Sequence, residues 1–415
     1  MKFENNLNIV IVNDFSNING GTAKIAINTA IGLSEAGYNV YFVSATGKIE
    51  KGLLESPLKS IVCLGQEEIL LSKNKMRALL RGLWNFRAYR KMSSLLASLD
   101  KDNTIIHVHG WIKALSISPI VAALRRSFPT VITLHDFFIY CPNGGFYNFP
   151  ANEICKKVPL SLDCISTHCD SRNYGFKLYR VLRNAVQKLA LSFFKSRLHF
   201  IALSNTSFKV LQPYVKNFAS TQFVENPIDV FRVPRVHVEN NKDCIFIGRI
   251  SPEKGIEYFG EALRELNYKH AVVVGEGLYL SELQNRYPEL NFVGWKNRSQ
   301  IIDLLKQARF LVFPSLWYET YGLVVQEACA FGVPCIVSDC TAASELINNG
   351  KSGLIFESKN VKELSKCMSK LLLDQEYLLS LSHAAYNKFW AIDHSLSKYV
   401  TDLRSAYNSV LQSTT

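Results

Sequence analysis

The 415-residue sequence contains no apolar run of the roughly 18 residues that a membrane-spanning helix requires. It also lacks a G-x-G-x-x-G pattern, which excludes the usual phosphate-binding turn of a dinucleotide-dependent dehydrogenase. No recognised DNA- or RNA-binding motif accompanies its basic residues, so nucleic acid is not an expected partner. The N-terminus, MKFENNLNIVIVND, lacks the layout of a signal peptide, and we expect a cytoplasmic protein.

Acidic residues are scarce relative to basic ones in the first half of the chain only. Residues 1–225 carry 27 Lys and Arg against 14 Asp and Glu, a net charge of +13, whereas residues 226–415 carry 20 against 21, net −1. This asymmetry predicts a polyanionic substrate or surface as the partner of the first half. The length and the apolar content of 48% suffice for two folded domains, each with its own core.

Two segments concentrate the positive charge and contain no acidic residue. Residues 70–92, LLSKNKMRALLRGLWNFRAYRKM, hold seven cations, and residues 176–197, FKLYRVLRNAVQKLALSFFKSR, hold six. Both segments are predicted to form amphipathic basic helices. The apolar stripe of the first suits either the domain core or an anionic lipid surface, to which the protein would bind peripherally at the inner face of the cell membrane. We expect the stripe of the second to face the core.

The first 45 residues predict a strand, a glycine-containing loop, a helix and a second strand. Residues 7–13 and 40–45 are the apolar runs, and Gly37 closes the intervening helix. Gly20 and Gly21 stand at the expected start of that helix, where glycine lets the backbone approach a ligand. This opening is typical of nucleotide-handling α/β folds.

The second half repeats the alternation and places polar residues where strands are expected to end. In residues 245–263, IFIGRISPEKGIEYFGEAL, Arg249 and Lys254 lie between an apolar run and a helix. Two cations at such a junction suit a diphosphate. The short runs VVVGEG at 272–277 and NFVGW at 291–295 continue the pattern.

The segment 314–339, PSLWYETYGLVVQEACAFGVPCIVSD, carries two glutamates eight positions apart. Glu319 follows the end of an apolar run, Gly322 stands at an expected helix start, and Glu327 lies just inside that helix. In open α/β sheets, ligands bind in the crevice outside the strand ends, and a helix N-terminus offers free N–H groups to phosphate. Carboxylates at this place can accept hydrogen bonds from sugar hydroxyls.

Taken in order, these segments resemble the C-terminal domain of glycosyltransferase family 4, and the two glutamates resemble its E-x7-E signature. The resemblance implies the α/β GT-B fold, with two Rossmann-like domains of doubly wound parallel sheet facing a deep cleft. We expect an acceptor-side domain over 1–222, with a cysteine-containing insertion at 141–172, and a nucleotide-sugar-binding domain over 223–394. The last helical stretch, 388–411, is expected to cross back, so that 395–415 packs on the first domain.

The resemblance also implies roles for individual residues. Arg249 and Lys254 are expected to neutralise the diphosphate of a UDP- or GDP-sugar, and Glu327 to bind its ribose. Glu319 is expected to hold the donor sugar, and His135, at the end of TVITLHDF, to hydrogen-bond a sugar hydroxyl. His135, Glu319, Arg249 and Lys254 form the expected catalytic set. Further donor contacts are expected at Gly20, Gly21, Tyr321, Gly322 and Leu323; Tyr321 stands where the family often has Phe.

The implied activity is that of a retaining hexosyltransferase with a glycan or lipid-linked acceptor, in bacterial-type surface polysaccharide synthesis, with no cofactor required for catalysis. Two alternatives stay open. A GT-B sugar-nucleotide epimerase would bind the same donor but would need an acid/base pair at the sugar. A degenerate transferase acting as a scaffold would have no need of the four residues of the catalytic set.

The segment between residues 141 and 169 has little periodicity and holds four of the ten cysteines. Four thiolates can bind Zn²⁺ tetrahedrally and hold such a loop together. Their spacing, however, is not that of paired C-x-x-C motifs. A structural zinc, free thiols and a disulfide are therefore all open, and the residues concerned are Cys141, Cys155, Cys164 and Cys169.

Overall fold

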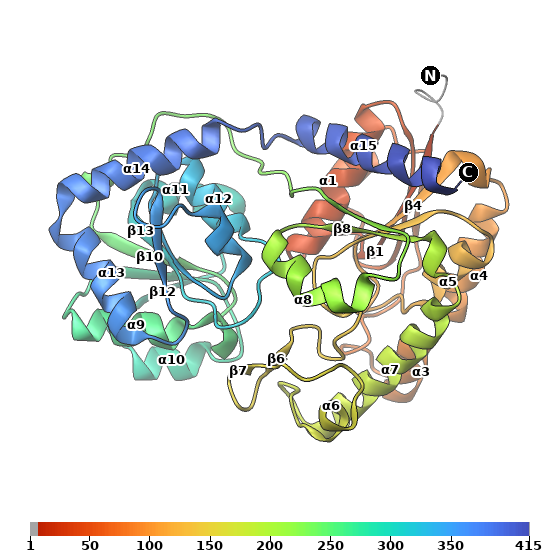
Figure 1. Ribbon diagram of the computed structural model, residues 1–415, viewed down its shortest axis with the longest axis horizontal. Helices are drawn as coiled ribbons and strands as arrows, with labels where there is room; N and C mark the ends of the chain where they lie inside the picture. The colour runs from red at the N-terminus through yellow and green to blue at the C-terminus, as the bar shows by residue number, and fades with distance from the viewer. Residues whose placement is uncertain (1–6, 415) are drawn as a thin grey trace.

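The structure of the protein is a computed structural model that describes residues 7–414. It contains two parallel β-sheets lying side by side, each packed against helices (Figure 1). The first sheet has the strand order β3-β2-β1-β4-β5-β8-β9. Its strands are β1 (Asn8–Phe15), β2 (Asn39–Thr46), β3 (Ser60–Cys63), β4 (Thr104–Val108), β5 (Thr130–Thr133), β8 (Leu198–Ala202) and β9 (Ser220–Phe223).

The second sheet has the order β12-β11-β10-β13-β14-β15. Its strands are β10 (Asp243–Ile247), β11 (Ala271–Val274), β12 (Asn291–Gly294), β13 (Ala308–Phe313), β14 (Cys335–Ser338) and β15 (Gly353–Phe356). These two sheets confirm the predicted doubly wound parallel α/β fold. The boundary predicted near residue 222 lies within β9, the last strand of the first sheet; as a domain limit it stays a prediction.

Each central strand is apolar on both faces because helices cover both sides of a parallel sheet. In β1, Ile9 pairs with Val40 of β2 and with Ile105 of β4, and all three are fully buried. The crossover helices of the first half are α1 (Gly21–Glu35), α2 (Lys51–Glu55), α3 (Lys75–Leu83), α4 (Phe86–Leu96), α5 (Ser118–Arg125), α7 (Tyr174–Ser192) and α8 (Asn205–Val215). Those of the second are α9 (Ile256–Glu265), α10 (Leu280–Arg286), α11 (Arg298–Lys306) and α12 (Leu323–Ala330); α13 (Val361–Leu373) and α14 (Gln375–Trp390) follow the last strand, β15.

The last helix, α15 (Leu396–Thr414), crosses from the second half to pack against α1 of the first, as predicted (Figure 1). The helical stretch expected over 388–411 is interrupted, because α14 ends at Trp390 and α15 begins only at Leu396. Tyr399, Leu403 and Tyr407 are buried against the first half. Burial of each large apolar side chain contributes about 1.5–3 kcal/mol of stability, so this contact holds the two halves together.

Two tyrosine hydroxyls of α15 reach buried polar groups, and they allow a matched test of this contact. Tyr407 bonds His107 Nδ1 at 2.6 Å, and His107 Nε2 is bonded to Thr133. We expect Tyr407→Phe to leave that buried nitrogen unpaired and to lower the free energy of unfolding by about 1–3 kcal/mol, measured by urea denaturation. Tyr399→Phe is the control, since its partner Thr29 keeps a second bond to Ile25 O. An equal loss in both variants would contradict the argument.

The orientation of α7 is the reverse of the predicted one. Its buried residues include Lys177, Asn184 and Gln187, whereas Leu189 and Phe193 are 64% and 74% exposed. The prediction that the apolar stripe of 176–197 faces the core was therefore wrong for most of α7, although Leu191 near its C-terminal end is buried in the core. The polar face is buried because hydrogen-bond partners for it lie in the loops beneath, so its burial carries little of the usual desolvation cost.

Candidate active site

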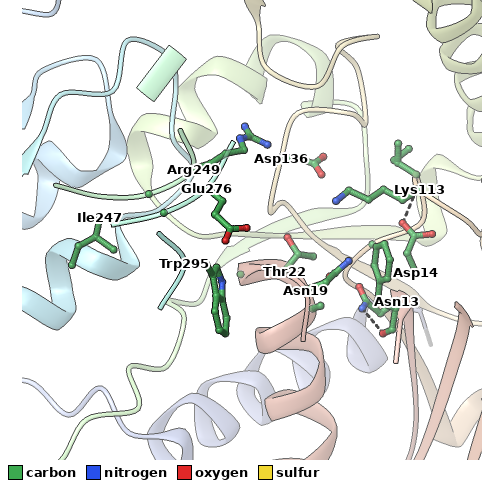
Figure 2. Close-up of a pocket in the computed structure, with 18 of the residues that line it drawn as sticks. Asn13, Asp14, Asn19, Thr22, Lys113, Asp136, Ile247, Arg249, Glu276 and Trp295 are labelled. Atoms are coloured by element: carbon green, nitrogen blue, oxygen red, sulfur yellow. Dashed lines mark hydrogen bonds between the residues drawn. The ribbon is translucent and has the colours of Figure 1, made fainter. Parts of the chain in front are cut away.

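A cavity of about 570 Å³ lies between the two halves and is lined by loops from both (Figure 2). In the first half these loops follow β1, β4 and β5, and in the second they follow β10, β11 and β12. All six loops leave the carboxyl ends of parallel strands, which is where open α/β sheets bind ligands. Figure 2 shows Asn13, Asp14, Asn19, Thr22, Lys113 and Asp136 opposite Ile247, Arg249, Glu276 and Trp295.

Asp14, at the end of β1, holds the loop after β4 in place. Its carboxylate accepts hydrogen bonds of 2.8 Å from the backbone N–H groups of Lys113, Ala114 and Leu115. Figure 2 shows the bond from Lys113. Burial raises the pKa of Asp14, and the three N–H groups and the charge of Lys113 only partly oppose that effect. This carboxylate therefore builds the cavity wall as well as lining it.

Asp136 follows β5 and lines the same cavity. Burial raises its pKa to about 6, against the hydrogen bond from Phe138 N–H and the charges of Lys113 and Arg183, while the charge of Asp14 raises it further. A carboxyl group with such a pKa can exchange a proton near neutral pH.

His135 is part of a histidine cluster beside the cavity and is not among the residues that line it. Its Nε2 lies 2.9 Å from His109 Nδ1, and the two rings stack with centroids 5.1 Å apart. Burial lowers the pKa of His135 to about 3, so the imidazole is neutral at physiological pH. Thr320 Oγ1 donates to its backbone carbonyl at 2.9 Å and links the two halves at this point. The predicted catalytic role of His135 stays a prediction.

Arg249 lines the cavity from the second half, where its Nη2 lies 2.7 Å from Glu253 Oε1. The Arg249 side chain is 60% exposed and Glu253 is buried, so the guanidinium has free donors toward the cavity. Lys254, the second expected phosphate ligand, is instead paired with Glu319 and does not line the cavity.

Glu319 is held from three sides by donors. Lys254 Nζ is paired with its Oε1, Trp317 Nε1 donates to the same oxygen at 2.9 Å, and Ser315 Oγ donates at 3.1 Å. Burial raises the pKa of Glu319, but the charge of Lys254 and the hydrogen bonds from all three outweigh it, so the net pKa is lowered. Gly255, with φ +72°, follows Lys254 where a Cβ would lie 2.0 Å from Pro314 O, and this close approach brings the two segments together.

Glu327 lines an adjoining cavity of about 430 Å³ with Lys24, Trp295 and Arg298. Lys24 Nζ lies 3.7 Å from its carboxylate. Burial raises the pKa of Glu327, against the charges of Lys24 and Arg298. The two cavities share lining residues, among them Gly20 and Trp295, so they adjoin one another.

The remaining predicted residues lie where the start of α1 meets the start of α12. Gly20 and Gly21 line the main cavity at the beginning of α1. A Cβ on Gly21 would lie 3.5 Å from Leu323, the first residue of α12, and Gly322 precedes it. Tyr321 donates to Glu225 at 3.3 Å. The structure thus brings the glycine loop of the first half against the helix start of the second.

The cysteine-rich insertion contains β6 (Tyr147–Asn148), β7 (Glu153–Ile154) and α6 (Leu162–Ser166). The Lys177 ammonium lies between Cys164 and Cys169, at 3.4 and 3.2 Å from their sulfurs, and Cys141 is bonded to Asn143. Within residues 7–414, no group of three or more His, Cys, Asp or Glu side chains is placed to hold a metal ion. This corrects the predicted structural zinc at Cys141, Cys155, Cys164 and Cys169, and all four are free thiols.

Several lining residues were not predicted as site residues, although their sequence position indicated them. All but Lys113 lie at or within three residues of the end of an apolar strand segment, as in LNIVIVND, TLHD, VVVGEG and NFVGW, whereas Lys113 lies five residues beyond β4. Motif matching selects the family's signature residues and passes over positions marked only by the end of a strand. The residues concerned are Asn13, Asp14, Lys113, Asp136, Glu276 and Trp295.

Two parallel-sheet α/β halves with a cavity at their strand ends and a last helix crossing back define the GT-B class of proteins. The family model described as "Glycosyltransferase Family 4" matches residues 19–232, and that of "Glycosyl transferases group 1" matches residues 228–388. The chain belongs to glycosyltransferase family 4.

Known relatives agree with this assignment. A galactosyltransferase of Escherichia coli, named UDP-Gal:alpha-D-GlcNAc-diphosphoundecaprenol alpha-1,3-galactosyltransferase, is 29% identical over 34% of this chain and 39% of its own length. An uncharacterized glycosyltransferase of Haemophilus influenzae is 22% identical over 92% of this chain and 95% of its own. The alignments with the first curated relatives span between 39% and 64% of those proteins.

Solved structures show the same fold at low identity. Sucrose-phosphate synthase of Thermosynechococcus elongatus is 15% identical with a TM-score of 0.69, covering 98% of this chain and 99% of its own. Anabaena HepE in complex with UDP-glucose is 17% identical with a TM-score of 0.69, covering 97% and 100%.

Proposed function

We propose that the protein is a retaining hexosyltransferase that moves a sugar from a UDP- or GDP-sugar to a glycan or lipid-linked acceptor in surface polysaccharide synthesis. The observation that carries the proposal is the pair of adjoining cavities, with Arg249 lining one, Glu327 lining the other and Gly20 lining both. A cation suits the diphosphate, a carboxylate suits the ribose hydroxyls, and the glycine loop admits the sugar and the acceptor.

The reaction proposed is front-face substitution at the anomeric carbon. The bond from that carbon to the diphosphate oxygen breaks, the acceptor oxygen bonds the same face, and the acceptor proton passes to the leaving phosphate oxygen. Arg249 stabilises the charge that develops on the diphosphate. Lys254 carries out the same role through a shift from Glu319 when the donor is bound, and Glu319 then accepts hydrogen bonds from the sugar.

The relatives support the choice of donor and acceptor. The Escherichia coli relative is named for a UDP-sugar and a diphosphoundecaprenol-linked acceptor, and the HepE structure contains UDP-glucose. The excess positive charge of residues 1–225 suits an acceptor that carries a diphosphate. We therefore propose UDP-sugars as the first donors to test, with the protein acting at the inner membrane face.

Thermal unfolding with UDP, GDP and their sugar conjugates tests the donor site. A ligand that binds only the folded state stabilises it, by about 2.7 kcal/mol at a hundredfold excess over Kd. We expect a rise in Tm with one nucleotide. In Glu327→Ala and Arg249→Ala the rise should be smaller, and the apparent affinity for that nucleotide should fall at least tenfold (~1.4 kcal/mol). Glu282→Ala and Lys269→Ala, which are exposed in the same half, serve as controls and should keep the full shift.

Transfer itself is tested with the donor that binds. NMR of the product should show the anomeric configuration of the donor; inversion would contradict the retaining mechanism. A rise in Tm with a donor, together with isomerised sugar and no transfer, would favour the epimerase. No shift with any nucleotide would favour the scaffold.

A further inference from the structure

The outer face of α7 is apolar along its whole length. Leu178, Leu182 and Leu189 of α7 recur at helical spacing on one side, Phe193 continues the row as the C-cap residue, and all four are exposed. The 19-residue helix is about 28 Å long, so this row is a continuous ridge and not a single exposed side chain. A ridge of this size on a protein surface indicates an interaction site.

Helix α3 lies beside α7 (Figure 1). Tyr179 OH of α7 donates to Leu79 O of α3 at 2.9 Å, and Met76 and Leu80 of α3 are exposed. We call these six apolar residues the α3/α7 face: Met76, Leu80, Leu178, Leu182, Leu189 and Phe193.

The charged residues of α3 and α7 are of one sign. Together the two helices hold seven Lys and Arg and no Asp or Glu. Exposed cations on the two helices include Lys75, Arg77 and Lys188. An apolar ridge with basic flanks matches a bilayer that contains anionic lipid, in which acyl chains take the ridge and headgroups take the cations.

The buried face of α7 is bonded to the wall of the cavity. Gln187 accepts from Trp111 Nε1 at 2.8 Å and donates to Phe138 O at 2.9 Å, and Arg183 donates to Ile112 O at 2.8 Å. Trp111, Ile112 and Phe138 all line the main cavity. One helix thus has its outer face free for a surface and its inner face fixed to the acceptor side of the site.

We propose that the α3/α7 face docks the protein on an anionic bilayer and so presents the first half's wall of the cavity to an acceptor anchored in that bilayer. This deepens the proposed function and rests on it for the acceptor. Within residues 7–414, no helix is both long and apolar enough to cross a membrane. Docking is therefore peripheral, with α7 lying along the surface.

Vesicle sedimentation tests the docking. The full chain is mixed with vesicles of phosphatidylcholine alone, or of phosphatidylcholine and phosphatidylglycerol in equal parts. We expect sedimentation only with the second, and a loss of about tenfold or more in Leu182→Glu/Leu189→Glu. Leu373→Glu, at a position 84% exposed in the other half, is the matched control and should bind like the wild type.

Several outcomes would overturn the proposal. These are no sedimentation of the wild type, equal sedimentation of the double variant, or a dimer by light scattering that the double variant converts to monomer, since the face would then join two copies. Nucleotide-induced Tm shifts establish that the double variant is folded. Transfer to a soluble acceptor without vesicle binding would defeat docking alone, whereas vesicle binding without any transfer would defeat the proposed function alone.

Discussion

Replacing Lys254 with methionine is expected to lower the free energy of unfolding by about 3–5 kcal/mol at neutral pH, because it leaves the buried Glu319 carboxylate without its counter-ion. The Lys254 and Glu319 side chains are only 16% and 14% exposed, so water replaces little of the lost interaction. Trp317 and Ser315 still donate to the carboxylate, but neither carries a charge.

The pH dependence of this loss gives a second measurement. In the wild type, the pKa of Glu319 lies below its ordinary value, so the pair's contribution is complete above the unfolded-state pKa and is lost as pH falls through the folded one. In Lys254→Met, burial is the main remaining influence on the Glu319 carboxyl group. Its folded-state pKa should therefore lie above the unfolded value of about 4.3. The variant's deficit should therefore shrink as pH is lowered from 7 toward that value, followed by urea denaturation at each pH.

Two further variants separate stability from catalysis. Lys254→Met/Glu319→Gln removes both charges and should recover most of the stability, while transfer activity stays about 10²- to 10³-fold below the wild type. Lys51→Met breaks an exposed ion pair with Glu55, in which the two side chains are 83% and 63% exposed. It should lower the free energy of unfolding by less than about 0.5 kcal/mol. A double variant as unstable as Lys254→Met would show that the loss arises from packing and not from the unpaired charge.

Asp14→Ala is expected to lower the free energy of unfolding by at least about 3 kcal/mol, because three buried or partly buried N–H groups lose their shared acceptor at once. The loop from Gly110 to Leu115 should open locally, which amide hydrogen exchange at Lys113, Ala114 and Leu115 would detect. Because this loop lines the main cavity, acceptor binding should weaken together with stability.

Asp14→Asn is the matched control for size. Its carbonyl oxygen can still accept from Ala114 and Leu115, whereas its amide group would face the Lys113 N–H, so we expect an intermediate loss. If the Asn variant were as stable as the wild type, the charge of Asp14 would be irrelevant to the loop. If the Ala variant kept slow exchange at all three amides, the proposed support of the loop would be wrong.

Much of the fold followed from local pattern. The alternation of short apolar runs with amphipathic segments predicted parallel sheets, because strands buried on both faces read as continuous apolar runs. The ends of those runs predicted where polar residues gather, and Arg249 and the glycine loop at Gly20 and Gly21 do line the cavity. The crossing of the last helix was implied by the family resemblance and was confirmed, although its break at residues 391–395 was not predicted.

The candidate site was only partly predictable, because several of its groups meet across long sequence separations. Lys254 and Glu319 were each expected to contact the donor, yet they pair with one another across 65 positions. The contacts of Asp14 with the loop after β4 span about 100 positions. No periodicity in a single segment encodes such a contact.

The sequence by itself determined the alternation of strands and helices, the family, and the uneven charge of the two halves, since these depend on local pattern and composition. Tertiary structure decided which face of α7 is buried and what surrounds the cysteines. An amphipathic pattern specifies two faces of a helix but not which of them points inward. Buried partners for Lys177 and Gln187 settled that choice, and the same lysine fills the space between Cys164 and Cys169.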